Sequence, residues 1–121
     1  MGRLTIALAL LLLIGCGTAG SGCSTVAIDW VDFIQVGSTQ YLAGPATISL
    51  QESDLGPVFA HVKFKVADNV CDPDYRPKDG DAAFLEPGTP IYQVNGQPPS
   101  VMLAAHQDGR IVPYTAAPKP T

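Results

Sequence analysis

Apolar and polar side chains alternate most regularly in residues 58–67. From Val58 to Val66 every second side chain is apolar, and the positions between them are more polar and include His61. Successive side chains of a strand point to opposite faces, so the pattern predicts a continuous β-strand with one apolar face.

A second alternation begins at residues 25–36 and is interrupted. Val26, Ile28 and Trp30 follow the period of a strand, but Asp32 followed by Phe33 shifts the apolar phase. Because a bulge or bend shifts the phase in this way, we expect one interrupted strand here.

The C-terminal part contains turn residues between short β-rich runs. Proline and glycine in Glu86-Pro87-Gly88-Thr89 stand where a type II turn requires them, and Asp108-Gly109 is a two-residue hairpin signal. Pro113 cannot donate a ladder hydrogen bond, so we expect the final strand at an edge, or this position to face outward. The predicted strands cover residues 82–85, 91–94, 101–106 and 110–115.

Residues 44–57 leave two alternatives open, a short strand at 47–50 and a helical turn at 52–55. No sustained helical periodicity competes with the strand pattern elsewhere. We therefore predict an all-β fold, a small, mostly antiparallel barrel or sandwich, as a single domain in residues 24–115. Residues 116–121, which are rich in proline, are expected to form a loose C-terminal tail.

The N-terminal apolar run differs from the rest of the chain. Arg3 precedes apolar residues 4–14, a run shorter than the roughly 20 residues that span a membrane. A charged start, a short hydrophobic centre and small residues at the exit predict a secretory signal peptide in residues 1–15. The domain that performs the function therefore starts later.

The run ends in Leu13-Ile14-Gly15-Cys16, which resembles the lipobox of bacterial lipoproteins. The resemblance implies that Cys16 is diacylated and becomes the mature amino terminus; the alternative is an ordinary secreted cysteine. Residues 16–23 would then be the lipidated cysteine and a flexible, glycine-rich tether. We expect a protein held at the extracytoplasmic face of the cell membrane by its lipid anchor.

Two cysteines, Cys23 and Cys71, remain once Cys16 is assigned to lipid. In a compartment outside the reducing cytosol an even remainder favours one disulfide, and two free thiols are the alternative. In the chain-entropy model such a bridge stabilises the fold by about 4 kcal/mol.

The charge of the chain restricts its partners. Without Arg3 there are six Lys and Arg residues against eleven Asp and Glu residues, a formal charge of −5. This balance argues against nucleic acid and against electrostatic adhesion to anionic lipid. The acyl chains are the expected contact with the membrane.

Four carboxylates lie close together in one turn-rich loop, residues 72–81. Their density could suit calcium, although the spacing departs from that of an EF-hand. Arg76 and Lys78 are alternative partners for these carboxylates, and a solvated loop pinned by the disulfide is the simpler interpretation, so no metal or cofactor site is assigned. The carboxylates are Asp72, Asp74, Asp79 and Asp81.

No catalytic motif is present in the sequence. His61 and His106 are the only histidines, neither has a motif around it, and no serine lies in a Gly-x-Ser-x-Gly elbow. We expect that the protein is not an enzyme. Most aromatic side chains should fill the core. Phe59 and Tyr75 are expected to be exposed, and exposed aromatic side chains often anchor contacts with other proteins.

Two short motifs link the body of the chain to a family. Gly-Asp-Ala-Ala-Phe-Leu at residues 80–85 and Gly-Thr-Pro-Ile-Tyr at 88–92 resemble small uncharacterised lipoproteins of actinobacterial type, over residues 55–114. The resemblance implies a shared domain and a surface location, and it assigns no particular activity. We expect a non-catalytic interaction module that contacts another envelope protein; the alternative is a small ion- or ligand-binding domain.

Replacing Cys16 by alanine tests the anchor. Without the thiol no acyl chain can be attached, so Cys16→Ala is expected to leave the membrane fraction in cell fractionation. Cys23→Ala, which keeps the acylation site, is the control and should remain with the membrane. Membrane retention of Cys16→Ala would contradict lipid anchoring.

Overall fold

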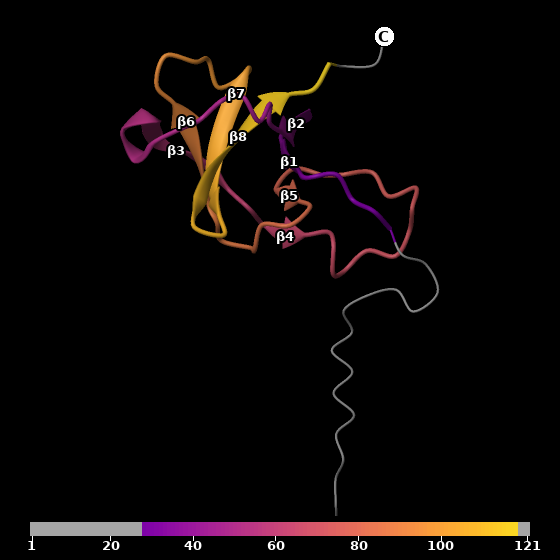
Figure 1. The fold of residues 1–121 in the computed structure, drawn as a ribbon. Coiled ribbons are helices and arrows are strands. Elements are labelled where there is room, and N and C mark those ends of the chain that lie inside the picture. Colours follow the sequence, from indigo (N-terminus) through magenta and orange to yellow (C-terminus); the bar gives the residue numbers. More distant parts are fainter. Residues whose placement is uncertain (1–27, 119–121) are drawn as a thin grey trace, which may run out of the picture.

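The structure, a computed structural model, describes residues 28–118, whose strands form one curled, mixed sheet resembling a half-barrel (Figure 1). The strand order is β3-β6-β7-β8-β2-β1-β5-β4, and only β4 and β5 pair in parallel. The predicted, mostly antiparallel all-β fold is confirmed. The elements are β1 (Phe33–Val36), β2 (Thr39–Ala43), the 3₁₀ turn η1 (Glu52–Asp54), β3 (Leu55–His61), β4 (Phe64–Lys65), β5 (Asp81–Ala82), β6 (Pro90–Val94), β7 (Met102–Gln107) and β8 (Arg110–Ala116).

The two edge strands of the sheet, β3 and β4, are consecutive in the chain. Only Val62 and Lys63 separate them, so the sheet has to curl until its two edges meet. Val62 is 2% exposed; its N–H donates to the Thr89 carbonyl (2.9 Å), and its carbonyl accepts from the Gly88 N–H (2.7 Å). The Lys63 N–H donates to the Gly80 carbonyl (2.8 Å). These bonds fix the joint between the edges.

The prediction of one continuous strand over residues 58–67 is therefore wrong. The segment breaks at the joint, and β3 shifts register against β6 on both sides of Val58. Val62 and Val66 are buried as the alternation predicts, whereas Val58 is 45% exposed. Phe59 is 43% exposed, as expected from the sequence. Bulges thus turn two consecutive large apolar side chains outward on an edge strand.

The main core lies on the face around which the sheet curls. Leu103 pairs with Tyr114 across β7 and β8, and both are fully buried in one cluster with Ile34 and Ile91. Ala104, the next residue on β7, points to the opposite face and belongs to another cluster. Alternating side chains thus separate an inner core from outer contacts.

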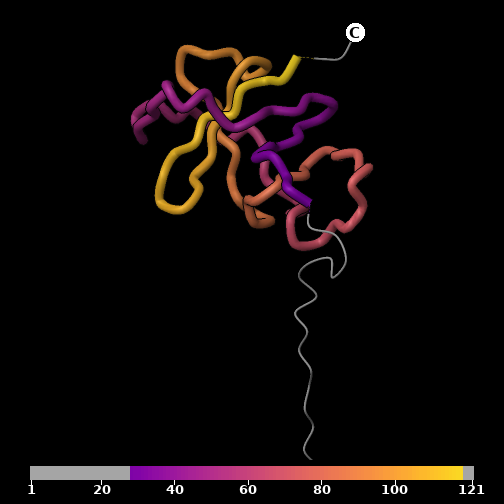
Figure 2. Tube along the Cα trace, turned by 45° about the vertical axis from the view of Figure 1, so that its right-hand side comes forward, coloured from indigo at the N-terminus to yellow at the C-terminus, as the bar shows by residue number. Residues whose placement is uncertain are grey.

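Two smaller clusters lie on the outer face of the sheet, under long connections. One contains Met102 and is covered by Ile48 and Leu50, from the connection between β2 and η1. The other contains Phe33 and is covered by Tyr75, from the loop between β4 and β5. Figures 1 and 2 show this loop beside the start of the described chain. Both connections therefore complete the fold.

The turns agree with the sequence. The Thr89 N–H donates to the Glu86 carbonyl (3.1 Å) and Gly88 has φ +93°, which confirms the type II turn. Asp108 (φ 52°) and Gly109 (φ 77°) close the β7–β8 hairpin. Of the predicted strands, those at 91–94, 101–106 and 110–115 correspond to β6, β7 and β8 within one residue at each end.

Other segments differ from their predictions. The strand expected at 25–36 begins only at Phe33 within the described residues, and that at 82–85 is reduced to β5. Of the alternatives in residues 44–57, the helical turn forms as η1, because Gln51 and Asp54 reciprocally cap it. Residues 47–50 form no strand.

The last strand is not at an edge, which corrects the expectation from Pro113. β8 lies between β7 and β2, and Pro113 is buried. The ladder with β2 ends where the Gly44 N–H donates to the Pro113 carbonyl (2.8 Å). Pro113 has no N–H to donate to the Gly44 carbonyl. The Thr115 hydroxyl donates to this carbonyl instead (2.7 Å). A side-chain hydroxyl thereby replaces the missing ladder donor.

Several predicted segments lie at or beyond the limits of the described residues. Ala116, expected in the tail, belongs to β8. The predicted signal peptide, the predicted tether, Cys16 and Cys23 lie outside the described residues, so their interpretations stay predictions. Within residues 28–118 no helix has both the length and the apolar character needed to cross a membrane.

Gly80 and Gly88 allow a matched test of the joint. Both have φ near +92° (+92° and +93°), but a Cβ on Gly80 would lie 2.5–2.8 Å from Lys63 side-chain carbons, whereas one on Gly88 would meet nothing within 4 Å. Alanine at either position should cost about 1–2 kcal/mol for the backbone conformation. Gly80→Ala should cost about 1–3 kcal/mol more, measured by denaturant unfolding. Equal losses would show that the joint tolerates the added carbon.

Candidate functional site

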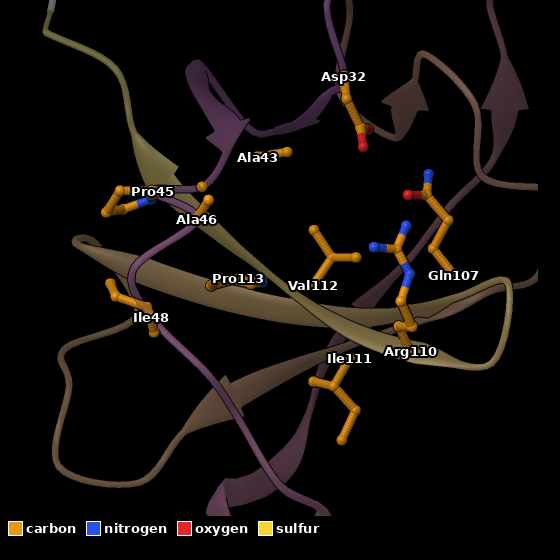
Figure 3. A pocket seen from close by; sticks show the side chains of 11 residues that line it. Asp32, Ala43, Pro45, Ala46, Ile48, Gln107, Arg110, Ile111, Val112 and Pro113 are labelled. Atoms are coloured by element: carbon orange, nitrogen blue, oxygen red, sulfur yellow. The ribbon is translucent and has the colours of Figure 1, made fainter.

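An open hollow of ≈ 430 Å³ lies where β2 separates from β8, and is named here the β8 hollow (Figure 3). Its polar side chains, Asp32, Gln107 and Arg110, gather at one end, and the rest of its wall is mainly apolar (Figure 3). This size and this mixture are typical of sites for small molecules or short chain segments. The lining residues are Asp32, Ala43, Gly44, Pro45, Ala46, Ile48, Gln107, Arg110, Ile111, Val112 and Pro113.

Asp32 is held in place by the core beneath it. Its Oδ1 accepts a hydrogen bond from the Tyr114 hydroxyl (3.0 Å), and the Gln107 side chain is a further partner. Burial raises the pKa of Asp32 above its ordinary value, although both hydrogen bonds act in the opposite direction. Burial also raises the pKa of Tyr114, and the neighbouring Asp32 adds to the effect. The carboxylate is thus fixed, partly desolvated and already hydrogen-bonded.

Arg110 differs from Asp32 because its charge has no fixed partner among the described residues. The residue is exposed and forms no salt bridge with any side chain of residues 28–118. Its guanidinium group extends beside Val112 toward the polar end of the β8 hollow (Figure 3). A planar cation in this state is suited to binding a carboxylate through two parallel hydrogen bonds.

A second hollow of ≈ 490 Å³ adjoins the first and shares four lining residues with it, Ala46, Ile48, Arg110 and Ile111. His106 lies in its wall, where Nε2 contacts Glu52 Oε1 and the ring meets Tyr92 edge-on (centroids 5.6 Å apart). Two side chains, Glu52 and Tyr92, therefore contact the imidazole. His61, the other histidine, is exposed at the end of β3.

Three of the four carboxylates of the acidic loop accept hydrogen bonds from groups of the protein. Asp72 Oδ1 accepts from the Asp74 N–H (2.9 Å). Asp79 accepts from the Gly37 N–H (2.7 Å) and from Lys63 Nζ (2.9 Å), and these bonds lower the pKa of Asp79. The cation that pairs with the loop thus comes from the joint between β3 and β4.

Asp81 is the buried member of the four carboxylates, at 4% exposure. Its Oδ2 accepts from the Tyr75 hydroxyl (2.6 Å) and the Lys78 N–H (2.8 Å). Burial, reinforced by Asp81, raises the pKa of Tyr75 to about 12. Tyr75 is half-buried and meets Trp30 edge-on, so the prediction that it is exposed is wrong. Lys78 lies over the Tyr75 ring (5.8 Å to the centroid).

Three of the four carboxylates considered for calcium, Asp72, Asp79 and Asp81, therefore already accept hydrogen bonds from the protein. Within residues 28–118 no three His, Cys, Asp or Glu side chains are grouped so that they could hold a metal ion. Cys71 is disulfide-bonded. Cys23 lies outside the described residues, so its pairing with Cys71 stays a prediction, as does acylation of Cys16.

The residues of the β8 hollow were not identified as a site by sequence reasoning. The signals present were local ones: the phase shift at Asp32 and the hairpin turn before Arg110. Nothing local shows that these two residues face one hollow, since they come from opposite ends of the domain.

The charge environments of Asp32 and Asp79 predict opposite responses to acid. A raised folded-state pKa gives Asp32 a stabilising contribution below its unfolded pKa of about 4, lost as pH rises through the folded value. The lowered pKa of Asp79 gives stability above about pH 4, lost as pH falls through the folded value. From pH 7 to 3, wild type should therefore gain Tm relative to Asp32→Asn and lose Tm relative to Asp79→Asn. Parallel trends in the two comparisons would contradict the assigned shifts.

Comparison with known proteins adds no further assignment. No protein-family model, curated protein or solved structure matches this chain. Any function given to it therefore rests on its own residues and their geometry.

Proposed function

We propose that this chain is a lipid-anchored protein of the extracytoplasmic face of the cell membrane, whose β domain is a non-catalytic interaction module for an envelope protein. The lipobox-like Leu13-Ile14-Gly15-Cys16 supports the anchor. Residues 17–22 would span roughly 13 Å as a flexible tether, which keeps the domain close to the headgroups. A partner would therefore be met at the membrane surface.

The observation that carries the interaction role is the outer side of β3. Val58 and Phe59 are consecutive, 45% and 43% exposed, on a strand that has β6 as its only neighbour among the described strands. Edge strands present main-chain donors and acceptors, and exposed apolar side chains beside them favour contact with another protein. We name this surface, Val58 and Phe59 on β3, the β3 patch.

The bulges of β3 make the patch specific to this fold. A regular strand would turn one of two consecutive side chains inward, but the register shifts at Val58 turn both outward. The buried Val62 fixes the end of the same strand, so the two side chains sit on a well-supported scaffold. An aromatic side chain in such a position is a frequent anchor of protein interfaces.

A second candidate function is binding of a small ligand, favoured by the β8 hollow. Its volume and its acid, amide and guanidinium groups fit a polar molecule with an apolar part. The ion-binding form of this alternative has less support, because two of the four carboxylates, Asp79 and Asp81, already bond to Gly37, Lys63, Tyr75 and the Lys78 N–H.

Crosslinking in intact cells tests the interaction module. The tagged, lipidated protein should capture one saturable envelope partner, and Cys16→Ala should lose it because the domain is no longer held at the membrane. Val58→Ser combined with Phe59→Ser should reduce capture at least fivefold.

Val101→Ser is the matched control, because Val101 is 43% exposed and lies outside the β3 patch. It should leave capture unchanged. Equal capture by the β3 variant and the control would overturn the role of the patch, and capture of no partner would favour the ligand-binding alternative.

A further inference from the structure

Strand β8 loses one of its two neighbours halfway along its length. β7 pairs with β8 from Arg110 to Thr115, whereas β2 pairs only from Tyr114 to Ala116. After Ala43 the chain turns away through a bond between Gly44 and Pro113. The first half of β8 therefore has a sheet neighbour on one side and the β8 hollow on the other.

The hydrogen bonds along β8 show which backbone groups face this hollow. In an antiparallel sheet, alternate residues bond to opposite neighbours. The Ala116 N–H donates to Val101 on the β7 side (2.8 Å), whereas the Ala117 N–H donates to Gln40 on the β2 side (2.8 Å). The Pro113 carbonyl also bonds on the β2 side, to Gly44. The backbone N–H and C=O groups of odd-numbered residues thus point to the β2 side of β8. Ile111, two residues before Pro113, belongs to the same series.

Ile111 consequently presents an N–H and a C=O to the hollow. No residue in 28–118 completes a backbone hydrogen bond with Ile111 on that side. One donor and one acceptor in line are what an added strand uses to pair with a sheet edge. The Gly44–Pro113 bond closes one end of the slot, so the added segment is short.

Neighbouring side chains define what this segment should carry. In an antiparallel or parallel pair, side chains of directly opposed residues lie on the same face. A residue opposite Arg110 would meet a guanidinium that has no salt bridge within residues 28–118, and a residue opposite Val112 would meet an apolar wall. Asp32 gives less reason to expect a basic side chain in the segment, because its carboxylate already accepts a hydrogen bond from Tyr114.

We propose that the β8 hollow binds an extended acidic peptide segment, which pairs its main chain with Ile111 and places an Asp or Glu side chain on Arg110. The residue two positions along the segment is aliphatic and packs on Val112. The hollow of ≈ 430 Å³ accommodates a segment of this length. This adds a second contact surface to the proposed interaction module, but it stands on the hollow alone and requires neither the anchor nor the β3 patch.

The test is peptide titration of the purified full chain, observed through its backbone amide NMR signals. The probes are Ac-Glu-Ala-Val-NH₂ and the matched Ac-Lys-Ala-Val-NH₂. We expect the glutamate peptide to shift the Ile111 amide signal and to bind at least tenfold more tightly than the lysine peptide. In Arg110→Glu this preference should reverse, because the charge facing the segment is reversed.

A second pair of variants isolates the main-chain contact. Ile111→Pro removes the N–H that faces the hollow and no N–H used by the β7 ladder, whereas Ile111→Ala shortens the same side chain and keeps the N–H. Binding of the glutamate peptide should be lost in the proline variant and kept within threefold in the alanine variant. If the proline variant does not fold, the charge reversal at Arg110 still decides the question.

Three results would overturn the proposal: no shift of the Ile111 amide with either peptide, equal binding of both peptides, or unchanged preference in Arg110→Glu. Binding of free glutamate as tightly as of the peptide would assign the hollow to a small molecule and also overturn the peptide. None of these results bears on capture through the β3 patch in cells, so failure here and failure of the interaction module are distinguishable.

Discussion

The structure depends on a covalent constraint: two residues connect the two edges of an eight-stranded sheet. Because β3 and β4 are separated only by Val62 and Lys63, the sheet cannot stay open, and its curl creates the enclosed face that holds the main core. Val62 is buried at this joint, and its backbone bonds to Gly88 and Thr89 tie it to the turn before β6. Chain connectivity here closes the fold where a hydrogen-bonded ladder would close a regular barrel.

This closure of the sheet affects both the β3 patch and the β8 hollow. β3 has to follow the curl while ending at the joint, and it accommodates the mismatch with bulges that expose Val58 and Phe59. On the other side of the sheet, β2 is too short to accompany β8, and the Thr115 hydroxyl satisfies the Gly44 carbonyl where the ladder stops. Beyond that point Ile111 is left beside a hollow. Incomplete strand pairing thus produces the candidate interaction sites.

The acidic loop illustrates how a dense cluster of chemistry-bearing residues can be structural. Asp72, Asp79 and Asp81 accept from backbone N–H groups, from the Tyr75 hydroxyl and from Lys63. The loop also covers a hydrophobic cluster around Phe33. Asp81 is buried because its oxygen receives two hydrogen bonds, which offset the loss of water. In the sequence the same carboxylates resemble calcium ligands, because their spacing along the chain does not reveal their hydrogen-bond partners.

The sequence by itself determined the turns, the β7–β8 hairpin and the all-β class, because these depend on backbone preferences of a few adjacent residues such as Asp108 and Gly109. Only the tertiary structure decided where the strand-like segment 58–67 breaks, which face Tyr75 packs on and that Asp32 lies near Arg110. These features arise from pairing and burial between residues far apart in the chain. The periodicity of a sequence predicts that side chains alternate between two faces of a strand. Which residue covers a given side chain depends on the tertiary structure.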